Sequence, residues 1–133
     1  MGQPAARQND AVSAVDVHIV MVPSPGGPVP TPLPHSFSGQ LLESVSTNVL
    51  IDGLPAATVG TVARNLPPHL PTPPGTVFQV SPMNQGSVQV GSVTVQINGK
   101  AAARQGDPVA TCTDVPGPPT GTITMGSPRV LIG

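Results

Sequence analysis

Two segments of the chain share an alternating pattern of apolar and polar positions that predicts short β-strands. In residues 46–57, the apolar side chains of Val49 and Ile51 are two positions apart, and residues 92–103 repeat the same pattern. Each strand is followed by an Asx-Gly dipeptide, which favours a tight turn because both residues accept a positive φ. The pattern therefore predicts two equivalent β-hairpins, each followed by a run of small residues.

The two ends of the chain carry the halves of a third copy. Residues 127–133 repeat only the strand, with Val130 and Ile132 in the matching places, and residues 2–10 supply the part that follows it. Joined end to end, the two halves rebuild the repeat. We therefore predict a single domain over residues 1–133 whose third repeat is split between the termini, and we expect the two chain ends to meet.

The composition favours a mainly β protein with a narrow core. Val occurs 19 times, Thr 12 times and Ile five times, whereas Trp and Tyr are absent. Branched side chains suit a pleated sheet, and 19 prolines disfavour helices and long central strands. We predict short strands joined by Pro/Gly-rich loops.

The charge balance excludes several function classes. Only 8% of the residues are charged and the formal net charge is −1, so the chain lacks the basic surface that nucleic acids require. It also lacks an apolar run long enough to cross a membrane, and its N-terminus does not have the pattern of a signal peptide. We therefore expect a protein that is made in the cytoplasm without an export signal.

Three corners after the strands carry a recognisable motif. Residues 4–10 read PAARQND, residues 101–107 read AAARQGD, and residues 55–61 read PAATVGT. These segments resemble the proline-alanine-alanine-arginine motif of the PAAR-repeat family. The middle copy departs from the motif, with Thr58 in place of Arg and Thr61 in place of Asp.

The resemblance implies a cone-shaped, pseudo-threefold β fold. Such proteins sit as monomers on the trimeric β-helical spike of contractile injection systems, which include the type VI secretion system, extracellular tail-like particles and contractile phage tails. The implied function is structural: the tip sharpens the spike for puncture of the target cell envelope and touches the target membrane only transiently. The implied location is the bacterial cytoplasm during assembly, followed by export with the particle.

The resemblance also implies a structural zinc ion near the tip, held by three His and one Cys. The chain contains three His and one Cys, namely His18, His35, His69 and Cys112. Their spacings match no zinc-finger pattern, and taken alone they equally fit solvated imidazoles and a buried thiol. The repeat register adds weight, because His18 and His69 each lie 14 residues after the Pro that opens a motif.

The proline-rich segments 22–35 and 65–75 flank the histidines. Proline restricts φ, so loops of this kind become ordered with few contacts, and we expect them to present the zinc ligands. A flexible linker or a proline-rich ligand for a partner domain is the other interpretation of such segments. The alternative function is accordingly a zinc-stabilised adaptor that recruits effectors through these loops.

The sequence offers little for catalysis. It contains no phosphate-binding loop, no nucleophile elbow and no zinc-protease motif. Asp10 and Asp107 occupy the same repeat position, three residues after Arg7 and Arg104, so we expect these pairs to brace the corners. A small zinc hydrolase remains the other alternative, and we predict that the protein is not an enzyme, because four protein ligands would leave zinc no open position.

Overall fold

The computed structural model describes residues 2–133, so Met1 of the predicted domain lies outside the described residues. Over these residues the protein has thirteen β-strands and no helix, which confirms a mainly β protein. No helix in the described part is therefore available to cross a membrane. The strands are β1 Gln3–Pro4, β2 Ala11–Val22, β3 Val29–Glu43, β4 Leu50–Ile51, β5 Leu54–Pro55, β6 Val62–Asn65, β7 Val77–Phe78, β8 Gln85–Val88, β9 Gln96–Ile97, β10 Lys100–Ala101, β11 Pro108–Ala110, β12 Gly121–Ile123 and β13 Leu131–Ile132.

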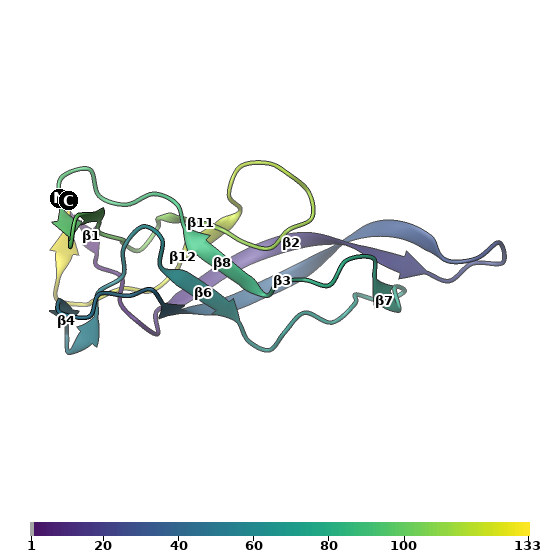
Figure 1. The fold of residues 1–133 in the computed structure, drawn as a ribbon, viewed down its shortest axis with the longest axis horizontal. Coiled ribbons are helices and arrows are strands. Elements are labelled where there is room, and N and C mark those ends of the chain that lie inside the picture. The colour runs from purple at the N-terminus through teal and green to yellow at the C-terminus, as the bar shows by residue number, and fades with distance from the viewer. Residues whose placement is uncertain (1) are drawn as a thin grey trace.

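Three small two-stranded sheets gather at one end of an elongated molecule, on the left in Figure 1. Two are the hairpins β4–β5 and β9–β10, whose Asx-Gly turns have the positive φ expected for them, 53° at Asp52 and 54° at Asn98. The third pairs β1 with β13, with Gln3 opposite Ile132. The two ends of the chain therefore lie side by side at this end, which we call the base.

The three motif segments are joined by a closed cycle of backbone hydrogen bonds. The N–H of Ala6 donates to the carbonyl of Ala103, that of Ala103 to Ala57, and that of Ala57 to Ala6, each at 3.0 Å. All three alanines are fully buried, so nothing larger than a methyl group fits at the centre of the cycle. The apolar side chains of the three small sheets pack together beneath it in one cluster: Ala5, Ile51, Ala56, Ile97, Ala102 and Ile132.

Ion pairs brace two of the three corners, as expected. A guanidinium nitrogen of Arg7 lies 2.9 Å from Asp10, and one of Arg104 lies 2.8 Å from Asp107. Each carboxylate also accepts the backbone N–H of its arginine. In the middle copy the hydroxyl of Thr61 accepts the corresponding N–H at 2.9 Å, so the corner keeps its backbone bond and loses only the ion pair.

Next to the base, six strands close into a small barrel. Their order is β12-β11-β8-β6-β3-β2, and β12 pairs again with β2, with Thr122 opposite Ser13. Closure removes the exposed strand edges that an open sheet would have here. The interior is filled by the larger hydrophobic cluster: Ala6, Val12, Ala14, Phe37, Leu41, Ala57, Ala63, Val88, Ala103, Val109 and Ile123.

Two strands run far beyond the barrel and form the opposite end of the molecule, on the right in Figure 1. β2 has 12 residues and β3 has 15, and they pair without interruption from Ala11–Gln40 to Val22–Val29. The prediction of short strands throughout is therefore wrong for this hairpin. Likewise, much of the expected proline-rich loop 22–35 is strand rather than loop.

The prolines of β3 are tolerated because of their register. Pro30, Pro32 and Pro34 occupy every second position, so their nitrogens share one edge of the strand. That edge faces away from β2, since the carbonyl of Pro34 accepts a hydrogen bond from the Thr72 hydroxyl at 2.8 Å. A proline on an outward edge removes no hydrogen bond of the ladder, so the strand continues through all three.

Candidate metal centre

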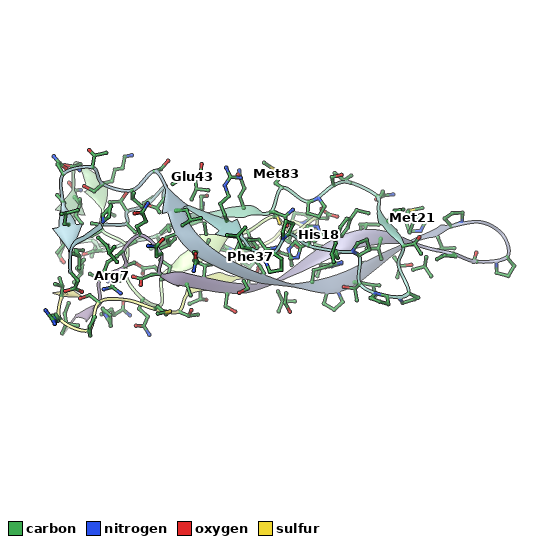
Figure 2. The ribbon with its side chains drawn as sticks, turned by 90° about the horizontal axis from the view of Figure 1, so that it is seen from below. Arg7, His18, Met21, Phe37, Glu43 and Met83 are labelled. Carbon is green, nitrogen blue, oxygen red and sulfur yellow. The ribbon has the colours of Figure 1, made fainter. Side chains whose placement is uncertain are left out.

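The site begins on β2, where the strand leaves the barrel. Asp16 and His18 are two residues apart, so both side chains point to the inner face of the long hairpin, and both are fully buried. Figure 2 shows His18 between Phe37, on the barrel side, and Met21, toward the hairpin tip. The alternation of β2 thus carries a carboxylate and an imidazole inward at a point where the barrel core ends.

Two loops bring the remaining members of the cluster. His69 follows β6 and is buried, and Cys112 follows β11 and is partly buried. One potential donor atom from each of Asp16, His18, His69 and Cys112 lies within 4.8 Å of the other three. The structure therefore gathers three of the four predicted ligands around one point and adds a carboxylate to them.

The carboxylate is the hub of the cluster. Its Oδ2 lies 2.9 Å from Nε2 of His69 and 3.3 Å from Sγ of Cys112. Sγ of Cys112 is in turn 3.7 Å from Nε2 of His18, and the hydroxyl of Thr111 donates to the other oxygen of Asp16. The donor atoms thus converge on one another instead of pointing to solvent.

His35 lies beside this cluster on β3, directly opposite Asp16 in the hairpin. Its ring centroid is 5.3 Å from that of His18 and 5.6 Å from that of His69. Its Nε2 accepts the backbone N–H of Thr72 at 3.1 Å, and its Nδ1–H donates to a backbone carbonyl. The structure therefore brings His35 to the site but directs its Nε2 to a backbone partner.

A second carboxylate orients His18. Asp114 accepts a hydrogen bond from Nδ1 of His18 at 3.1 Å, and its other oxygen accepts the N–H of Ile19 at 2.9 Å. With the proton held on Nδ1, the lone pair of Nε2 faces the cluster. Carboxylates commonly support metal-bound histidines in this way and raise the basicity of the ring.

The electrostatics of the cluster are compatible with a bound cation. Burial, together with the neighbouring carboxylate of Asp16, raises the pKa of the Cys112 thiol to about 11. Burial also lowers the pKa of His35. Within residues 2–133 Asp16 has no Lys or Arg partner, although it is fully buried. A buried carboxylate of this kind is stabilised by a metal ion.

The donor set fits zinc. Two imidazole nitrogens, a thiolate sulfur and a fourth nitrogen or oxygen are the usual ligands of a closed tetrahedral site. Sequence reasoning missed both carboxylates because it considered only histidine and cysteine as metal ligands. The available signal was spacing, since Asp16 is two residues from His18 on β2 and Asp114 is two residues from Cys112 in the loop after β11.

Comparison with models of protein families gives a match in the C-terminal half of the chain. The family model described as PAAR motif matches residues 69–133, a region that includes His69, Cys112 and the third corner. No curated protein matches the chain.

Proposed function

Because the chain is a PAAR-repeat protein, we propose that it caps a trimeric β-helical spike of a contractile injection system and sharpens it for puncture of a target envelope. The role is structural rather than enzymatic. The protein acts as a monomer, assembles on the spike in the bacterial cytoplasm and leaves the cell with the particle.

The observation that carries this proposal is the cyclic arrangement at the base. The hydrogen bonds among Ala6, Ala57 and Ala103 relate three similar corners and three similar small sheets around one centre. A single chain with this pseudo-threefold base matches a threefold partner end to end. In this proposal residues 2–133 form one PAAR-repeat domain, with its third repeat split between the chain ends.

The opposite end supports the puncturing role. Residues 17–42, which include most of the long hairpin, contain no Asp, Glu, Lys or Arg, and the same holds for residues 65–80, which run beside it. Two carboxylates, Asp16 and Asp114, contact histidines of these segments, and both belong to the candidate metal centre. A narrow hairpin without charged side chains avoids the cost of stripping water from ions when it enters an apolar phase.

We propose that the centre holds one structural zinc ion, with His18, His69 and Cys112 among its ligands. Bound zinc would cross-link β2 to the two loops that pack beside it, where the barrel core no longer supplies apolar contacts. For the fourth ligand, the family resemblance indicates His35 and the donor cluster contains Asp16. Metal content of the Asp16→Asn and His35→Ala variants distinguishes the two, since loss of the true ligand lowers zinc retention more.

The zinc proposal is tested by elemental analysis of protein purified without chelator. We expect one zinc per chain in the native protein and its loss in His18→Ala and Cys112→Ala. Met83→Ala, a change at an exposed residue, is the matched control and retains the metal. Native protein free of transition metal would refute the zinc site.

The spike-tip role is tested on particles. Electron microscopy of spikes assembled with the protein should show one added density at the point of each trimer. His18→Ala and Cys112→Ala should reduce delivery into target cells. If both variants deliver cargo at the native rate from tips of normal shape, the puncturing role of the metal-braced end is wrong.

A further inference from the structure

The three corners of the base differ in one contact. At the first corner Arg7 reaches across to Asp52, on the neighbouring hairpin, at 2.9 Å. At the third corner Arg104 reaches the carbonyl of Gly133, on the sheet formed by the chain ends, at 3.2 Å. At the middle corner the arginine is replaced by Thr58, which is too short to span the same interval.

At the middle corner, which lacks an arginine, a pocket occupies the space that a guanidinium group would fill. Asn98 occupies the position in its hairpin that Asp52 occupies in the previous one, and the isolated bridge between Thr58 and Ala102 places this hairpin beside the middle corner. Thr58 and Asn98 both line a pocket of about 110 Å³, together with Ser46 and Lys100. The pocket is thus the space that arginine side chains cover at the other two corners.

The middle corner also differs from the other two in its charged residues. At the other corners the cation is balanced by Asp10 or Asp107, whereas the middle corner has Thr61 at that position. Lys100 supplies a cation at the pocket, where the equivalent residues of the other two sheets are Gln3 and Leu54. Lys100 is exposed, and within residues 2–133 it makes no ion pair.

We propose that this pocket receives a carboxylate side chain, aspartate or glutamate, from the spike on which the base rests. The inference depends on the proposed function, because it names a contact of the same interface. The partner's carboxylate would pair with the ammonium group of Lys100 and supply the anion that the middle corner lacks. A cationic side chain does not suit the pocket, because Lys100 would repel it and no carboxylate lines the cavity.

The first test removes the charge and keeps the fold. Lys100→Gln places at this position the residue type that Gln3 has in the equivalent sheet. We expect it to weaken binding to the purified trimeric spike of the particle about tenfold, a typical loss for a partly desolvated ion pair. Arg129→Gln is the matched control, since Arg129 is another exposed base residue without an ion pair in the described chain. The control should bind within about twofold of the native protein.

The second test fills the pocket. The double variant Thr58→Arg with Thr61→Asp rebuilds at the middle corner the pair that Arg7 and Asp10 form at the first. We expect it to fold and to melt no higher than the native protein, because the pair fits the two equivalent corners whereas the hydrogen bond from the Thr61 hydroxyl to the carbonyl of Ser44 is lost. We also expect it to bind the spike about tenfold more weakly, since its guanidinium would occupy the space meant for the partner.

The outcomes distinguish failure of the proposed pocket from failure of the proposed spike-tip function. Weaker spike binding by Lys100→Gln and by the double variant, with a native-like Arg129→Gln control, supports the pocket. Native affinity in both variants overturns the pocket and leaves the spike-tip function standing. An equal loss in the control shows that only net charge matters, which also overturns it. If the native chain binds no trimeric β-helical spike, the proposed function fails and this inference fails with it.

Discussion

Truncation of Phe37 tests whether the barrel core and the metal centre form one packed unit. Phe37 is 1% exposed and is the largest of the fully buried side chains. Its ring lies within the barrel cluster, and its centroid is 6.2 Å from that of His69. Phe37→Ala therefore leaves a cavity that borders both the apolar core and a proposed zinc ligand.

The expected cost is large for a protein of this size. Removal of a buried phenylalanine ring destabilises by about 3–5 kcal/mol, because apolar burial is lost and the cavity does not fully collapse. A domain of this length is stable by about 5–15 kcal/mol in total. A loss of this size corresponds to a melting temperature lower by about 10–20 °C.

The assay is denaturant unfolding of native and variant protein, each measured with zinc and with chelator. Because the ring supports His69, we expect Phe37→Ala to cost more in the zinc-loaded protein than in the chelated one. Val93→Ala is the control, since the Val93 side chain is 96% exposed and belongs to neither hydrophobic cluster. A cost below about 1 kcal/mol for Phe37→Ala, or one equal to that of the control, would refute the packing described here.

Four further predictions concern the Cys112 thiol, the buried alanine cycle and the prolines of β3. Because the pKa of Cys112 is raised to about 11, zinc binding at pH 7 should release about one proton, which calorimetry in two buffers of different ionisation enthalpy measures. In chelated protein the raised pKa of Cys112 should make the free energy of unfolding fall as the pH rises from 9 toward 11, because the thiol of the unfolded chain loses its proton first. A free energy of unfolding that stays constant over this range would contradict a buried Cys112 thiol. Ala103→Leu should destabilise by at least about 1–3 kcal/mol in thermal melts, because the centre of the hydrogen-bonded cycle has no room for it, whereas Ala101→Leu at a partly exposed site should cost less. Pro32→Thr should leave stability within about 0.5 kcal/mol but promote self-association in light scattering, because it restores an outward N–H on a free strand edge; unchanged scattering would show that the prolines do not protect this edge.

The base could be predicted from the sequence because its information is local and repeated. An alternating strand, an Asx-Gly turn and a small-residue corner specify each hairpin, and three copies specify a common environment. The meeting of the chain ends follows from the split copy alone. Even the corner pairs Arg7–Asp10 and Arg104–Asp107 are readable, since their partners are three residues apart.

The long hairpin could not be predicted in the same way. Proline is a reliable signal against a central strand, but the signal depends on which edge of the strand is free. That edge is determined by the pairing of β3 with β2 on one side and with β6 on the other, where the partner reaches only to Gly39. The alternation of Pro30, Pro32 and Pro34 was the only local sign that a strand would accept them.

Of the candidate metal centre, the sequence predicted the gathering of His18, His69 and Cys112 and not that of the carboxylates. The repeat register pointed to His18 and His69, which lie the same distance after the Pro of their motifs, and Cys112 was named from the family resemblance. Asp16 comes from no repeated position, and its role depends on the face of β2 that the barrel buries. An acidic residue becomes informative only when the strand it lies on, and the side that faces inward, are known.

The antiparallel contact between Gln3 and Ile132 makes the polypeptide almost circular. A short peptide joining Gly133 to Gly2 would cost little entropy, and new termini could then be opened in the exposed turn around Gly26. Such a rearranged chain should adopt the same shape. Any domain or label fused to the existing chain ends would therefore lie at the base. It would leave the tip of the long hairpin free.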